Sequence, residues 1–206
     1  MCFVPANKNL SFDVKLGYTQ KTDWMPSWVK WLIIGQLLIV YTYASVAKFY
    51  PDWLNAIVAK NIMSGKQDWF LVGHIVDQRW AHYVIAYFGI IFDLLIIPAL
   101  LYKPTRKVAF ILAVFFHLYN SFVLHIGIFP YLALAFCLFF FDPKVIRNIF
   151  YPKSKRNEFT KPIDFKYNQL ITVGICVWLF FQFILPLRHW VIPGDCLLYT
   201  SDAADD

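Results

Sequence analysis

The chain has 206 residues, of which 59% are hydrophobic, 20% are aromatic and only 16% are charged. Because about 25% of the residues of an average soluble domain are charged, this composition excludes a disordered chain, a nucleic-acid-binding arm and an ordinary cytosolic enzyme, and it predicts a membrane protein with several spans. The net charge of +6 bears only on topology, since Lys and Arg cluster between the apolar segments.

Five segments are apolar enough to cross or enter a bilayer, and they predict an all-α membrane bundle of about five transmembrane helices. They cover residues 28–49, 83–102, 108–128, 131–141 and 170–187. The fourth is short beside the roughly twenty residues of a full span, so we expect Phe129-Pro130 to break a longer helix at a membrane interface. The apolar residues of segment 51–63, which is too short to span, predict a short helix lying in the interface.

The basic residues predict the orientation of the chain. Three clusters fall on one side of the membrane if all five segments cross, and the positive-inside rule makes that side cytosolic. The clusters are Lys8, Lys15, Lys21 and Lys30; Lys103, Arg106 and Lys107; and Lys144, Arg147, Lys153, Lys155, Arg156, Lys161 and Lys166. The connector 49–81 and the chain after Arg188 then face the lumen or the exterior.

Lys48 lies at the non-cytosolic end of the first apolar segment. One interpretation is that its side chain snorkels to the membrane interface. The other is a poorly hydrated pocket that disfavours the ammonium form, so that some neutral amine exists near pH 7 and can accept a proton. The pattern leaves both interpretations open.

Asp93 lies in the middle of the second apolar segment, between Phe92 and Leu94. A lone carboxylate at this depth must be neutral, paired with a partner or facing an aqueous cavity. Structural pairing and a functional role are both compatible with the sequence.

Four polar residues of the third segment, His117, Asn120, Ser121 and His125, lie near one helical stripe, because they are spaced three, four and eight residues from the first. Such a stripe can join helices through hydrogen bonds, or it can line a cavity for a polar head group. The two histidines have no further ligands at suitable spacing, so we expect no metal site.

The run 43–54, YASVAKFYPDWL, resembles the Lys-x-x-x-Asp-Trp-Leu segment of the vitamin K-dependent γ-carboxylase family, whose membrane part is called the horizontally transferred transmembrane (HTTM) domain. Three further markers follow in family order. They are FDLLIIP at 92–98 with Thr105-Arg106 and Ala109-Phe110, FHLYNS at 116–121 with IGIFPY at 126–131, and PLRH at 186–189 with Pro193-Gly194. The resemblance covers about residues 11–195.

The resemblance implies an enzyme that oxidises vitamin K hydroquinone with O2 to the epoxide, and uses the strong base so generated to carboxylate glutamate of a protein substrate with CO2. No side chain at pH 7 can deprotonate a γ-carbon, so cofactor oxidation must supply the driving force. The family's lysine base corresponds to Lys48, the catalytic candidate. The candidates for binding the quinone are His117, Asn120, Ser121, His125 and Asp93.

The chain departs from the family pattern, and we expect it to be an inactive middle fragment of an intact enzyme. Family members have further membrane helices ahead of it, one bearing a histidine near the quinone, and a lumenal domain after it. Ser45 stands where many relatives have Gly, and Leu124 where many have Phe.

Four parts are expected along the chain. Residues 1–23 lack the features of a signal peptide and read as a truncated start, residues 24–190 form the HTTM-like transmembrane domain, and residues 191–195 begin a lumenal domain. Residues 196–206, CLLYTSDAADD, break the preceding composition. They resemble a translated sequencing adapter, so we expect a library artefact.

Two other functions remain open, a membrane protein of the same fold without γ-carboxylation and a transporter. A transporter would favour broken helices in repeated halves, and the sequence has no internal repeat. The expected partners are the lipid bilayer and a glutamate-containing protein substrate, with no nucleic acid. The expected location is the endoplasmic reticulum for a eukaryotic protein and the plasma membrane for a bacterial one.

Overall fold

A computed structural model of the chain describes residues 11–18, 26–65, 73–76, 78–124, 127–150 and 168–188. Within these ranges all regular elements are helices and no strand occurs. Four helical stretches are long and apolar enough to cross a membrane. They are α2 (Ser27–Val46), α6 (Arg79–Leu101), α7 (Arg106–Leu124), and α10 (Asn168–Ile184) with the 3₁₀ helix η2 (Leu185–Leu187).

A fifth, shorter apolar stretch is formed by α8 (Phe129–Cys137) and the 3₁₀ helix η1 (Leu138–Phe140). It starts with Pro130 in its first turn, where proline is tolerated because the first amide groups of a helix have no partner inside it. The predicted helical membrane bundle and its five apolar segments are therefore confirmed, with the fourth too short for a full span, as expected.

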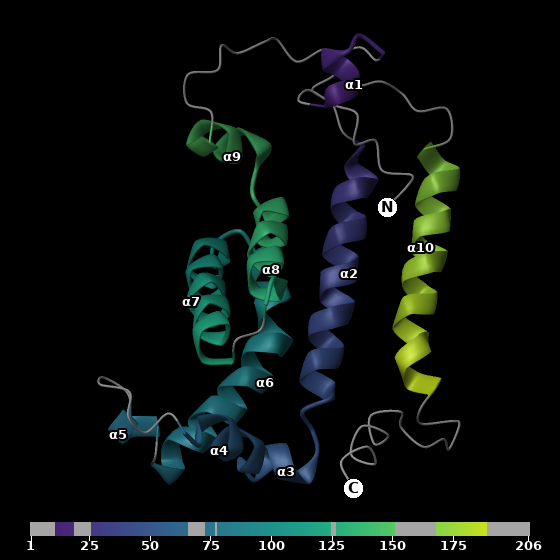
Figure 1. The fold of residues 1–206 in the computed structure, drawn as a ribbon. Helices are drawn as coiled ribbons and strands as arrows, with labels where there is room; N and C mark the ends of the chain where they lie inside the picture. Colours follow the sequence, from purple (N-terminus) through teal and green to yellow (C-terminus); the bar gives the residue numbers. More distant parts are fainter. Residues whose placement is uncertain are drawn as a thin grey trace, which may run out of the picture. The chain divides into compact units, whose positions relative to one another are not determined.

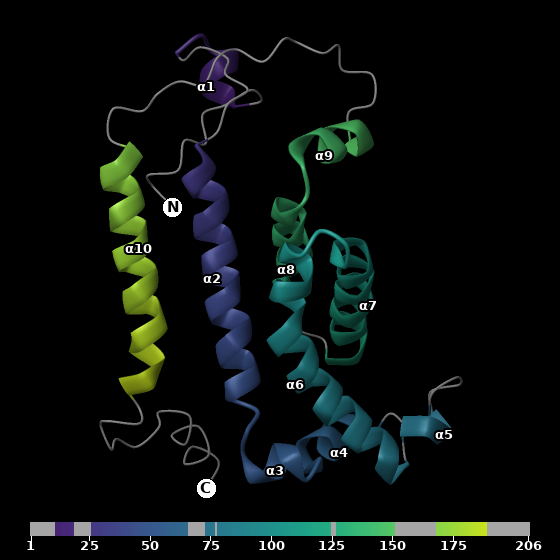
Figure 2. The same ribbon diagram turned by 180° about the vertical axis from the view of Figure 1, so that it is seen from behind.

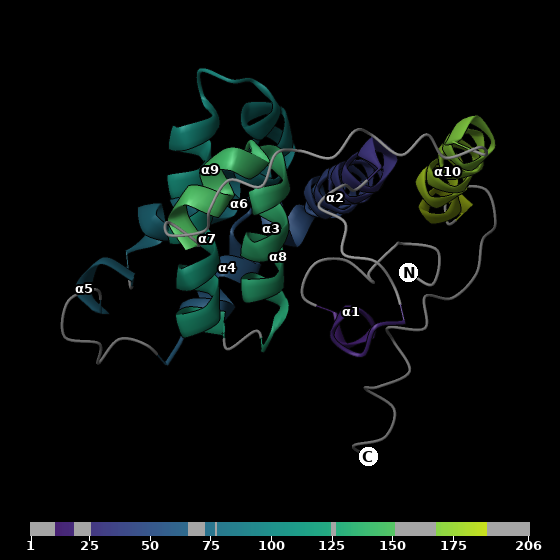
Figure 3. The same cartoon turned by 90° about the horizontal axis from the view of Figure 1, so that it is seen from above.

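The chain divides into two compact units, Met1–Phe165 and Lys166–Asp206. In the first unit α2 and α6 pack side by side, and α7 packs against both α6 and α8 (Figures 1 and 2). Seen from above, α7 and α8 lie next to each other (Figure 3). The remaining short helices are α1 (Phe12–Lys15), α5 (Gly73–Val76) and α9 (Pro143–Phe150).

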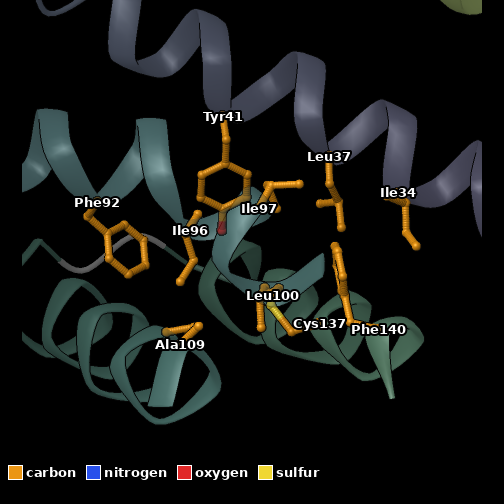
Figure 4. Packing of buried hydrophobic residues seen from close by; sticks show 11 residues of the cluster. Ile34, Leu37, Tyr41, Phe92, Ile96, Ile97, Leu100, Ala109, Cys137 and Phe140 are labelled. Atoms are coloured by element: carbon orange, nitrogen blue, oxygen red, sulfur yellow. The ribbon is translucent and has the colours of Figure 1, made fainter. Parts of the chain in front are cut away.

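The main core lies where α2, α6, α7 and the α8–η1 stretch meet. Side chains of α2 point toward those of α6, and the far side of the cluster is closed by α7, α8 and η1 (Figure 4). Its buried members include Ile34, Leu37, Tyr41, Phe92, Ile96, Ile97, Leu100, Ala109, Ala113, Cys137 and Phe140. These residues recur every three or four positions along each helix, so they form one stripe per helix.

The interfacial segment differs from the sequence prediction, because it forms two short helices instead of one. These are α3 (Pro51–Leu54) and α4 (Ile57–Met63). Ala56 between them has a φ of 57° in the left-handed region, which interrupts the α-helical hydrogen bonding. The turn lets Trp53 of α3 and Ala59 of α4 pack in one cluster on α6, together with Ala56 and Ala86. Burial of this cluster offsets the strain at Ala56.

The far end of α6 is closed by the Thr105-Arg106 pair that the sequence marks as a family feature. Thr105 Oγ1 donates to the carbonyl of Ala99 at 2.7 Å. Arg106 donates through Nε to Leu100 O at 2.8 Å and through a terminal nitrogen to Leu101 O at 3.0 Å. The last carbonyls of a helix have no partner inside it, and in a membrane protein an unsatisfied carbonyl is costly, so these residues stabilise the turn into α7.

The contact between α2 and α6 depends on a small residue. Ser45 of α2 is completely buried, and its Oγ donates to Ile90 O of α6 at 3.2 Å. Small side chains allow membrane helices to approach closely. Ser45 is therefore a close contact between α2 and α6, near the Lys48 that follows α2 and the Asp93 of α6.

We expect Ser45→Leu to lower the free energy of unfolding by about 1–3 kcal/mol, because a larger side chain has no room between α2 and α6. Ser45→Ala should cost less, about 0.6 kcal/mol, since it removes one interhelical hydrogen bond. Thermal unfolding in detergent measures both. The matched control is Val46→Leu at the exposed neighbouring position; an equal loss of stability in this control would contradict the assignment.

Candidate functional site

The centre of the candidate site is an ion pair between two membrane helices. Lys48, two residues after α2, donates from Nζ to Oδ2 of Asp93 in the middle of α6. The Lys48 side chain is 20% exposed and that of Asp93 7%. Two charges so poorly hydrated are tolerated only when each satisfies the other. Asp93 is therefore accommodated in its membrane span by pairing with a basic residue.

The direction of the Lys48 side chain separates the two interpretations of this residue. Its Nζ also donates to the carbonyl of Ala44 at 3.0 Å, one turn earlier in α2. The side chain thus runs back along the helix, toward the interior of the bundle. A snorkelling lysine would extend the other way, past the nearer helix end. The geometry matches a lysine held in a poorly hydrated site.

Trp53 of α3 covers the amine. Lys48 Nζ lies 5.3 Å from the centre of a Trp53 ring, within cation–π range. The indole is fixed in place because its Nε1 donates to Ala86 O of α6 at 3.0 Å. Gly89 of α6 lies beside both side chains, and a Cβ at this position would meet Trp53 at 3.7 Å and Lys48 at 4.0 Å. The Lys-x-x-x-Asp-Trp motif thus brings its lysine and tryptophan together.

A second polar pair lies on the same face of α2. The Tyr41 hydroxyl and His117 Nε2 of α7 are 2.6 Å apart. Tyr41 and Lys48 are seven residues apart, so about two helical turns, or roughly 10 Å, separate their positions along the axis. Phe92, the residue before Asp93, has its ring 6.1 Å from that of His117. The two polar pairs therefore border one continuous contact between α2 and α6.

His117 is 2% exposed, and aromatic rings surround it. Ring centroids of Tyr41, Phe92, Phe116 and Phe129 lie 5.5–6.4 Å away, all in edge-on orientations. Its Nδ1 is buried and has no hydrogen-bond partner among the residues that the structure describes. A buried polar atom without a partner is uncommon and costly, so this nitrogen is a candidate contact for a polar group of a bound molecule.

The other residues of the predicted polar stripe separate from His117. Ser121 donates to the hydroxyl of Tyr131 at 3.1 Å, so it joins α7 to α8. Asn120 is half-buried and makes no side-chain hydrogen bond with a residue that the structure describes. His125 lies outside the described residues. Across the described ranges, no three His, Cys, Asp or Glu side chains gather where they could hold a metal ion.

The sequence analysis did not identify Tyr41 as a residue of the site, and it did not predict that Trp53 contacts Lys48. A signal for Tyr41 existed, because Tyr41, Ser45 and Lys48 follow each other at helical spacings of four and three and so share a face. Trp53 was interpreted as part of the interfacial helix. No spacing rule could show that its ring turns toward Lys48, since that depends on the contact of α3 with α6 and on the hydrogen bond from the indole to Ala86 O.

The helical bundle with a charged pair between two of its apolar helices defines a polytopic α-helical membrane protein. The family model of the HTTM domain matches residues 1–144, and the chain belongs to this family. The match confirms the resemblance to the membrane part of vitamin K-dependent carboxylase-type proteins. No solved structure matches the chain.

We expect Lys48→Met to lower the free energy of unfolding by about 3–5 kcal/mol, because it leaves the Asp93 carboxylate buried without its partner. The double variant Lys48→Met/Asp93→Leu should recover most of this loss, since a well-packed apolar pair costs nothing to desolvate. A double-mutant cycle of thermal unfolding in detergent measures the coupling. Additive losses in the double variant would show that the two residues do not interact.

Proposed function

We propose that the intact protein is a vitamin K-dependent carboxylase-type enzyme, in which Lys48 is the base that takes a proton from the hydroquinone. The observation that carries the proposal is the setting of Lys48: the lysine of the family motif points into the bundle, paired with Asp93 and covered by Trp53. A lysine that served only to anchor a helix end would face the aqueous interface.

The Asp93 carboxylate helps Lys48 to act as a base in two ways: it can take a proton from Nζ, and it can stabilise the ammonium form. Proton transfer from Nζ to the carboxylate gives a neutral amine and a neutral acid, which a poorly hydrated site favours over separated charges. The neutral amine can then accept a hydroxyl proton. If the carboxylate is ionised, it stabilises the ammonium that results. Arginine could not serve in this position, because its guanidinium stays protonated.

The chemistry of the residues around His117 supports our proposal of a quinone-type cofactor. Nδ1, which has no hydrogen-bond partner among the described residues, can bond a ring oxygen, and the rings of Phe92, Phe116 and Phe129 make its surroundings apolar. When bound, vitamin K hydroquinone with O2 supplies the driving force for removing the γ-proton of glutamate, which no side chain can do alone. His117 would orient the ring, with its tautomer set by the Tyr41 hydroxyl.

In the intact protein we expect Lys48→Ala to lower hydroquinone epoxidation by about 10²–10⁴-fold, the usual effect of losing a general base. Small exogenous amines should restore part of the activity, and Lys48→Arg should not. The measurement is the rate of epoxide formation, with protein carboxylation followed in parallel. Lys103→Ala, at an exposed position just beyond the C-terminal end of α6, is the matched control.

The arginine variant separates this function from the alternatives. If Lys48 only stabilises the bundle through Asp93, Lys48→Arg keeps the ion pair and should keep activity and stability. That outcome would discard the catalytic role and leave a membrane protein of the same fold without carboxylation.

The role of His117 gives a different kinetic signature. We expect His117→Leu to raise the KM for hydroquinone by about tenfold with a smaller change in kcat, because it removes one hydrogen bond to the bound ring. Tyr41→Phe removes the partner of Nε2 but leaves Nδ1 in place, so its effect on KM should be smaller. Equal changes in KM for the two variants would indicate that His117 acts only through packing.

A further inference from the structure

A pocket unrelated to the Lys48 amine opens between α4 and the first turns of α6, with a volume of about 460 Å³. Its polar lining side chains are Asn55, Lys60, Arg79, His82 and Tyr83. Every one of them can donate a hydrogen bond, and none is an acid. A lining of this kind suits an anion.

Within the described part of the chain, the two cations of the pocket have no acidic partner. Neither Lys60 nor Arg79 forms an ion pair with any residue of the described ranges. The two residues belong to different elements, since Lys60 lies in α4 and Arg79 is the first residue of α6. The fold therefore brings them to one pocket. A phosphate or carboxylate between them would receive charge-assisted hydrogen bonds from both sides.

The position of the pocket in the bundle points to a membrane lipid. Arg79 begins a helix that is long and apolar enough to span the membrane, so the pocket lies at the level of an interface. Next to it on α6, Trp80 is 60% exposed and Val84 57% exposed, and Ile57 of the pocket wall is 46% exposed. An aqueous peptide would leave this apolar rim bare, whereas lipid chains would cover it.

The location also departs from the charge pattern of the chain. Lys103, Arg106 and Lys107 lie at the opposite end of α6, on the predicted cytosolic side. Basic residues are depleted on the other side of membrane proteins, yet Lys60 and Arg79 meet there at one pocket. A bound anion would stabilise these two positive charges and so account for their position.

We propose that this pocket binds the headgroup phosphate of an anionic phospholipid, held between Lys60 and Arg79, with the acyl chains lying against Trp80 and Val84. Basic pockets between membrane helices bind anionic headgroups on the cytosolic side, and we extend this mode of binding to a pocket on the other side. The inference does not depend on the carboxylase proposal, because it uses neither Lys48 nor His117.

The test titrates the full chain in neutral detergent with dioctanoyl phosphatidylglycerol and with dioctanoyl phosphatidylcholine, followed by native mass spectrometry and thermal shift. The chain should bind the anionic lipid more tightly than the zwitterionic one. Lys60→Gln/Arg79→Gln should weaken binding of the anionic lipid by about 30-fold, and each single variant by about fivefold. The matched control Lys103→Gln/Lys107→Gln removes two exposed cations at the other end of α6 and should leave binding unchanged.

Three results would overturn the proposal. The first is equal binding of the anionic lipid by the pocket variants and the control. The second is full displacement by inorganic phosphate at the same concentration, which would mean that the lipid chains contribute nothing. The third is binding of a short glutamate-containing peptide in the absence of lipid binding, which would assign the pocket to a peptide carboxylate. Because the single variants each remove one exposed charge, they keep the test available if the double variant unfolds.

Discussion

The ion pair between Lys48 and Asp93 is the interaction on which the arrangement of the first unit depends. A carboxylate in the middle of a membrane helix requires a partner, and the nearest available cation comes from the end of α2. To reach Asp93, the lysine side chain must turn back along its helix to the level of Ala44. The pair therefore requires α2 and α6 to approach closely, which the fully buried Ser45 permits.

The same constraint explains why the chain turns sharply after α2. Lys48 follows the end of α2, so it stays poorly hydrated only when another side chain covers its amine. Trp53 covers it. Its indole faces both the amine and the carbonyl of Ala86, because α3 begins directly after the extended residue Tyr50 and packs against α6. The Lys-x-x-x-Asp-Trp spacing is thus the length of chain needed to leave a helix, turn, and return a tryptophan to its lysine.

The two polar pairs of the bundle differ in what they leave free. Lys48 and Asp93 pair with each other, an amine with a carboxylate. One ring nitrogen of His117 contacts the Tyr41 hydroxyl, and the other lies among aromatic rings with no hydrogen-bond partner in the described ranges. The first arrangement agrees with the proton transfer that we propose for Lys48, and the second with the ring binding that we propose for His117. Both polar pairs border the contact between α2 and α6.

Composition and hydrophobic periodicity were sufficient to predict a helical membrane bundle and the five apolar segments, because the bilayer allows few structures for long apolar sequences. They also identified Lys48, Asp93 and His117, since ionisable groups are rare at that depth. The partners of these residues were decided only by tertiary structure. Whether Lys48 faces the interface or Asp93 depends on how α2 crosses α6. The partners of Tyr41 and Trp53 likewise depend on contacts between helices that are distant in the sequence. The same holds for the division of segment 51–63 at Ala56. No local pattern encodes such contacts.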